Sequence, residues 1–216
     1  LMIGFKLDEL GLLEDLKVQH CFIKAPVFPF AKFPGVDTIL GPEMKSTGEV
    51  MGVAETFGEA YAKAQISAGV VLPKGGVTFI SVNDRDKRNI GDIAKGFKDL
   101  GFDIIATNGT AEKLREKGID ADSVYKVNEG RPNIVDLIRS EQVDLVINTP
   151  LGKESFFDEK AIRRACVQYH KPCITTLSAA AAAVRAIEAL QNKQIEVLSL
   201  QEYHSMDSNS MQVEGR

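Results

Sequence analysis

The chain has 216 residues, of which 44% are hydrophobic and 26% charged, and its formal net charge is -4 at pH 7. This composition is typical of a soluble globular protein, and the acidic balance argues against a nucleic-acid-binding surface. Three scattered cysteines predict reduced, buried thiols in a cytoplasmic protein, and three distant histidines predict no metal site. No apolar run reaches the roughly 20 residues that cross a membrane.

The first third of the chain shows no regular alternation of strands and helices. Its patterns predict, in chain order, a helix at 7–16, an extended segment at 21–25, a looped stretch at 26–48 and a helix at 55–67. A linker follows at 72–76.

From Val77 onward, short apolar β-branched runs alternate with helical patterns. They predict strands near 77–82, 102–106, 123–127, 144–148 and 172–175, and helices near 86–100, 110–117, 132–140, 158–169 and 178–191. Such alternation is typical of an α/β fold with a doubly wound, mainly parallel five-stranded sheet. A last apolar run at 195–200 predicts an edge strand, and residues 205–216 predict a flexible tail.

Polar side chains follow four of the predicted strands. In an open parallel sheet, ligands bind in the crevice outside the carboxyl ends of the strands. Hydroxyls, amides and two lysines at that edge therefore predict a pocket for a phosphorylated small molecule. The candidate residues are Ser81, Lys87, Thr107, Thr110, Lys126, Asn148 and Thr149.

The turn at 107–110 is the clearest candidate for a phosphate site. Gly109 permits a tight turn and Thr110 is a good N-cap, so free N–H groups at the start of a helix would favour an anion. Lys87 opens a helix, where a cation is unfavourable unless an anion lies nearby. The alternatives are a plain capped turn and a Lys87 paired with Asp84 or Asp86. Neither a P-loop nor a dinucleotide fingerprint occurs, which predicts binding and no reaction.

Two segments resemble a known family. Residues 28–53, FPFAKFPGVDTILGPEMKSTGEVMGV, resemble the end of the second ATP-grasp half of carbamoyl-phosphate synthetase large subunits. Residues 77–204 resemble their C-terminal allosteric domain, which is similar to methylglyoxal synthase. The resemblance implies an incomplete ATP-grasp tail at 1–72, a methylglyoxal-synthase-like domain at 73–204 and the flexible tail at 205–216.

The resemblance also implies what the intact protein does. Members make carbamoyl phosphate from bicarbonate, ATP and glutamine-derived ammonia, for arginine and pyrimidine biosynthesis. They act with a glutamine amidotransferase small subunit, with ATP, Mg or Mn, and K, and as oligomers in the cytoplasm. The family's catalytic ATP- and metal-binding residues precede Leu1, so the resemblance implies a regulatory piece with no catalytic residue and no cofactor of its own.

In bacterial members this domain binds UMP as an inhibitor, and in some members IMP at an overlapping site. The family's nucleotide contacts fall on the seven candidate residues above. Asn128 and Pro150 replace a His and a Thr of some members, which weakens the expectation for IMP. Thr175 matches a second effector site, but Ala25 and Cys173 replace its Glu and Tyr, so the resemblance implies weak or no activation by ornithine.

Two other functions stay open. A stand-alone lyase like methylglyoxal synthase needs a carboxylate base in a Gly-Asp motif, but the matching positions are Gly130, Arg131 and Pro132. An arginine cannot accept the proton, so the substitution argues against the lyase hypothesis. Alternatively, the helices at 162–169 and 178–190 would serve only in oligomerisation.

Overall fold

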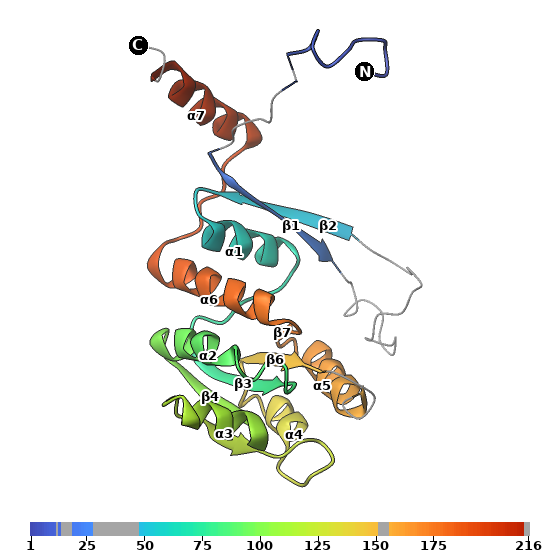
Figure 1. Ribbon diagram of the computed structural model, residues 1–216, viewed down its shortest axis with the longest axis vertical. Coiled ribbons are helices and arrows are strands. Elements are labelled where there is room, and N and C mark those ends of the chain that lie inside the picture. The colour runs from blue at the N-terminus through green and yellow to red at the C-terminus, as the bar shows by residue number, and fades with distance from the viewer. Residues whose placement is uncertain (12, 14–18, 28–47, 151–155, 214–216) are drawn as a thin grey trace.

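The computed structural model describes residues 1–11, 13, 19–27, 48–150 and 156–213 (Figure 1). A two-stranded antiparallel sheet and one helix precede a five-stranded sheet that has helices on both faces. The first unit consists of β1 (Cys21–Val27), β2 (Gly48–Ala54) and α1 (Phe57–Ser67). Among the described residues, no helix is long and apolar enough to cross a membrane.

The first unit matches the sequence predictions in part. β1 and α1 lie where an extended segment and a helix were expected, and Thr56 caps α1 by accepting from the Glu59 N–H. β2 was missed, although it pairs with β1 along its whole length. The predicted helix at 7–16 is wrong for residues 7–11, which form turns, because Gly11 at φ 66° turns the chain back to Asp8. Residues 28–47, which include most of the predicted looped stretch, lie outside the described residues.

The second unit is the predicted doubly wound sheet, and every strand pair in it is parallel. Its strands lie in the order β5-β4-β3-β6-β7. The chain order reverses between β3 and β6, which is the position where open α/β sheets bind ligands. The strands are β3 (Gly76–Val82), β4 (Phe102–Thr107), β5 (Asp122–Val124), β6 (Leu145–Thr149) and β7 (Cys173–Ile174). The helices are α2 (Ile90–Asp99), α3 (Asn108–Glu116), α4 (Ile134–Arg139), α5 (Phe156–Gln168) and α6 (Leu177–Asn192).

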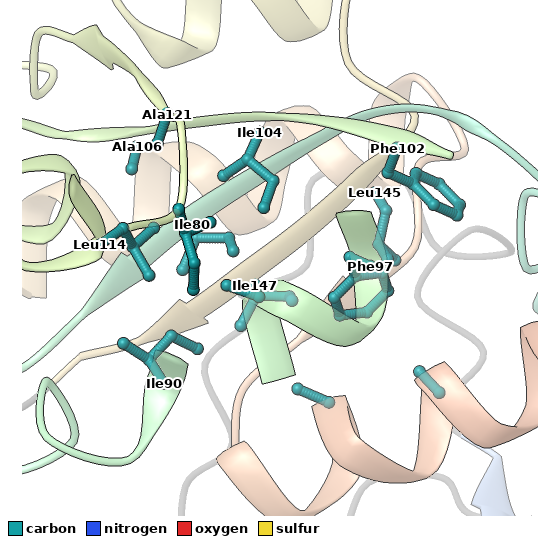
Figure 2. Packing of buried hydrophobic residues seen from close by; sticks show 14 of the residues in the cluster. Ile80, Ile90, Phe97, Phe102, Ile104, Ala106, Leu114, Ala121, Leu145 and Ile147 are labelled. Carbon is teal, nitrogen blue, oxygen red and sulfur yellow. The ribbon is translucent and has the colours of Figure 1, made fainter. Parts of the chain in front are cut away.

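The two faces of this sheet bury separate hydrophobic clusters. Helices α2, α3 and α6 cover one face, where Phe97 and Ile80 are fully buried (Figure 2). Helices α4 and α5 cover the other face around Phe79. Phe79 and Ile80 are neighbours in β3 but belong to different clusters, because successive side chains of a strand point to opposite faces. Burial on both faces explains why the strands are almost continuously apolar.

The first unit packs on the second through α1 and α6, which lie side by side in Figure 1. The helices approach closely at Gly58: a Cβ there would lie 2.5 Å from the Arg185 carbonyl oxygen. An ion pair adds to this contact, because Lys193 Nζ lies 3.0 Å from Glu59 Oε1. The hydrogen bond from Lys193 lowers the pKa of Glu59 below its ordinary 4.5, against the opposing effect of burial.

Replacing Glu59 by Gln should reduce stability in a pH-dependent way. The pKa of Glu59 is lower in the folded chain than in the unfolded chain, so the ion pair stabilises the fold fully above pH 4.5. This stabilisation is lost as the pH falls through the lower pKa of the folded chain. Glutamine keeps the capping bond with Thr56, so only the charge is removed. Urea unfolding of Glu59→Gln should show a loss of less than about 1 kcal/mol at pH 7, discounted for solvent screening, and a smaller loss below pH 4.

Glu49→Gln is the matched control, because Glu49 pairs with Lys24 where both side chains are largely exposed. A Glu59→Gln deficit that is equally large at pH 7 and pH 3 would show that the ion pair does not contribute.

The C-terminal predictions need correction. Residues 194–199 form no edge strand, because Ile195 packs against the α6 side of the core while Val197 is exposed. The expected flexible tail began at residue 205, but residues 205–213 are helical, because α7 spans Leu200–Val213; residues 214–216 lie outside the described residues. Ser199 and Glu202 form reciprocal hydrogen bonds at its start, which is a capping box. Tyr203 then donates to the Val53 carbonyl at 2.8 Å, so α7 is tied to β2.

Candidate functional site

A cavity of about 500 Å³ opens at the carboxyl ends of β3, β4 and β6. Its volume lies within the range of small-molecule sites. The topology explains the position, because the parallel strands β3 and β6 end side by side where the strand order reverses. All seven residues selected from the sequence line this cavity, namely Ser81, Lys87, Thr107, Thr110, Lys126, Asn148 and Thr149.

The floor of the cavity is a set of buried hydroxyl and amide groups. Ser81 on β3 lies directly opposite Asn148 on β6. The Thr107 hydroxyl is within hydrogen-bond distance of Ser81 Oγ, at 3.4 Å, and of Thr110 Oγ1, at 3.2 Å. Thr110 in turn accepts from the Val82 N–H. These bonds hold the hydroxyls in fixed positions before any ligand arrives.

The start of α3 forms the cationic end of the cavity. Thr110 is not its N-cap, as the sequence had suggested: α3 begins at Asn108, and Thr110 lies inside the first turn. Lys87 does not open a helix either, because α2 begins only at Ile90. Instead Lys87 reaches across to α3, where its Nζ lies 3.0 Å from the place of a Cβ on Gly109. An ammonium and the positive end of a helix dipole therefore meet at one point, which favours an anion there.

Exposed carboxylates hold both lysines of the cavity. Lys87 Nζ lies 2.7 Å from Asp84 Oδ1, and the Asp84 side chain is 92% exposed. The hydrogen bond from Lys87, followed by its charge, lowers the pKa of Asp84. Lys126 Nζ lies 3.5 Å from Glu129 Oε1. Since exposed ion pairs are weak, an incoming anion can displace Asp84 and Glu129 at small cost.

Sequence reasoning missed several polar residues of this cavity, among them Asn83 and Asp158. Asn83 donates to the Thr149 carbonyl at 3.0 Å and to Asp86 at 2.7 Å, which fixes the loop between β3 and α2. Asp158 lines the cavity from the first turn of α5, and burial raises the pKa of its carboxyl, against the effect of nearby Lys126. In the sequence Asp158 is one of two acids at a predicted helix start, a position that ordinary dipole pairing explains.

Two other residues singled out from the sequence lie elsewhere. Thr175 lines a second cavity of about 420 Å³ between the first unit and the α5–β7 edge, so it does not join the seven. Arg131, which stands where a lyase would need its base, is not among the residues that line the first cavity. Its side chain is 79% exposed and lies 3.7 Å from Asp136 Oδ1.

The cavity thus has a cationic end at Lys87 and the start of α3, together with the buried neutral side chains of Asn148 and Thr149. Asp158 and Glu159 also line it. Such a lining suits a small molecule that has an anionic group together with hydroxyl or amide groups.

Comparisons with known proteins agree with the family that the sequence resembles. Residues 89–175 match the MGS-like domain. Over 95% of its length the chain is 57% identical to the carbamoyl phosphate synthase large chain of Acidobacterium capsulatum, and over 94% it is 55% identical to that of Archaeoglobus fulgidus. It covers 19% of each of these relatives.

A third relative places the similarity within the large chain. The carbamoyl phosphate synthase large chain, C-terminal section, of Methanopyrus kandleri is 54% identical over 93% of this chain, which covers 38% of that relative. The chain therefore belongs to the carbamoyl phosphate synthase large-chain family and corresponds to its C-terminal, MGS-like part.

Proposed function

We propose that this chain is the regulatory C-terminal part of a carbamoyl phosphate synthase large chain, and that its strand-end cavity binds UMP as an inhibitor. One observation carries the proposal: seven polar residues from four strand ends converge on one cavity whose cationic end combines Lys87 with the start of α3. That combination recognises a phosphate monoester.

The rest of the cavity suits a nucleoside. Asn148 offers both a donor and an acceptor, and Thr149 adds a hydroxyl, so both can bind ribose hydroxyls or a base. The apolar side chain of Val127 also lines the cavity and is partly exposed, so it offers contact area for a flat ring. The Asp158 carboxyl can accept from an N–H of the base.

The intact enzyme would make carbamoyl phosphate from bicarbonate, ATP and ammonia that a small glutamine amidotransferase subunit supplies. This part would contribute control and no catalytic residue. For UMP to inhibit, it must bind one arrangement of the enzyme more tightly than another, and such coupling is typically about 1–3 kcal/mol. The contact of α6 with α1 offers a route from the nucleotide domain to the rest of the enzyme.

Calorimetric titration of UMP into the chain tests the proposal, with uridine as the comparator. We expect saturable binding of UMP and much weaker binding of uridine, because uridine lacks the phosphate. Lys126→Ala should weaken UMP binding on the order of fivefold, since half-exposed Lys126 contributes a screened charge.

The matched control is Lys113→Ala, which removes a lysine that does not line the cavity. Equal affinities for UMP and uridine, or an equal effect of the two substitutions, would argue against a phosphate-directed site.

A further inference from the structure

Cys166 and Cys173 form a thiol pair at the far edge of the sheet. Cys166 lies near the end of α5 and is 2% exposed, whereas Cys173 begins β7 and is partly exposed. The turn between them is tight: His170 has a φ of 52° and the Lys171 N–H donates to the Cys166 carbonyl at 2.9 Å. This turn brings the two side chains together: Cys173 packs against the hydrophobic cluster that contains Cys166, and both line one cavity.

Cys173 can be reached by a small molecule. Both cysteines line the second cavity, whose volume of about 420 Å³ is large enough for a small organic molecule. Arg163 and Lys171 line the same cavity, and Lys171 Nζ lies 3.6 Å from Asp144 Oδ1. Among the described residues, Arg163 Nε is buried without a hydrogen-bond partner, while its Nη2 lies 2.7 Å from Glu159.

The two thiols have different reactivities. The hydrogen bond from Cys166 lowers the pKa of Cys173, and Arg163 lowers it further, against the effect of burial. The same hydrogen bond raises the pKa of Cys166, as does burial. The thiolate is the nucleophile in thiol chemistry, and an incoming reagent meets the partly exposed Cys173 before the 2% exposed Cys166. Cys173 is therefore the attacking residue and Cys166 the resolving one.

We propose that Cys166 and Cys173 are a modification site that forms a reversible disulfide by exchange with a low-molecular-weight disulfide such as oxidised glutathione. The Cys173 thiolate attacks one sulfur of the reagent, whose S–S bond breaks, and one glutathione thiolate leaves. The Cys166 thiol then gives up its proton and attacks the Cys173 sulfur, and the second glutathione leaves. Two thiols of the protein are oxidised and one disulfide is reduced to two thiols.

The bond would join the end of α5 to the first residue of β7, two elements that otherwise meet through apolar packing in one cluster. Reversible disulfides of this kind in cytosolic proteins are usually redox-sensing, so the site would report the thiol–disulfide balance around the protein.

Alkylation and mass measurement test the proposal in a Cys21→Ser chain. Cys21 is on β1 and does not line the second cavity, so its removal leaves only the pair. After incubation with oxidised glutathione and quenching with N-ethylmaleimide, we expect loss of both alkylatable thiols, a mass lower by two hydrogen atoms, and a peptide that joins Cys166 to Cys173. Dithiothreitol should restore both thiols.

A second variant identifies the order of attack. With Cys166→Ser added, Cys173 should accumulate a glutathione adduct, whereas with Cys173→Ser added, buried Cys166 should stay unmodified. Circular dichroism confirms that each variant is folded. Two free thiols in the Cys21→Ser chain after an incubation that oxidises its urea-unfolded form would overturn the proposal, as would two glutathione adducts in place of an internal bond.

Discussion

Phe97→Ala should lower the free energy of unfolding by about 3–5 kcal/mol, the largest single effect that we expect in this chain. Phe97 is fully buried on α2 and meets Phe102 of β4 edge to face, with ring centroids 5.6 Å apart (Figure 2). Its removal leaves a cavity between α2, α6 and the sheet that rigid neighbours cannot fill. The midpoint of urea unfolding, followed by circular dichroism, measures the loss.

Phe22→Ala provides the control for this substitution. Phe22 is a phenylalanine of β1 that is 49% exposed, so its replacement should cost much less than that of Phe97. Comparable losses from the two substitutions would mean that the cluster on the α2 face is not the main core of the domain.

The parallel sheet was predictable because its signals are local. Each strand is a short apolar run, and each helix has its own apolar face. When strands and helices alternate, the crossover connections between parallel strands are almost always right-handed. The register of β3 with β6 then follows, and with it the meeting of Ser81 with Asn148. The sequence alone therefore places the residues at these strand ends along one edge of the sheet.

The missed elements depend on contacts between distant parts of the chain. β2 is a strand because it pairs with β1, whose residues lie more than 20 positions earlier. The capping box of Ser199 and Glu202 is a local signal for the start of α7, but the helix is positioned by Tyr203, which reaches Val53 and Lys63. Neither contact leaves a periodic signal in the sequence.

The site shows the same division between local and distant causes. The types of the seven polar residues and their positions at the strand ends could be predicted from the sequence, but the groups that each side chain contacts could not. The sequence assigned Lys87 to the start of α2, whereas the side chain crosses to Gly109 of α3. Asp158 became a site residue only because α5 carries it to the mouth of a cavity built by other elements. Positions along a chain indicate which groups exist, and packing decides which of them meet.

Lys87→Met should weaken UMP binding about 10- to 100-fold. Methionine keeps the apolar stem and removes the ammonium that lies over the first turn of α3. Hydrogen bonds to a charged group contribute about 1.5–3 kcal/mol, and every 1.4 kcal/mol is about tenfold in affinity. Lys87 is only 26% exposed, so its charge is less screened than that of Lys126, and the loss should be larger. Calorimetric titration of UMP measures the change.

Two controls make this result specific. Lys95→Met removes an exposed lysine of α2 that does not line the cavity, and it should leave UMP affinity unchanged. Uridine should bind the Lys87→Met chain as weakly as it binds the original chain, because uridine has no phosphate for Lys87 to contact. If Lys87→Met instead weakened uridine and UMP by the same factor, Lys87 would shape the cavity and not recognise the phosphate. Equal midpoints of urea unfolding for the two lysine variants would show that Lys87→Met loses a contact with the ligand and does not destabilise the fold.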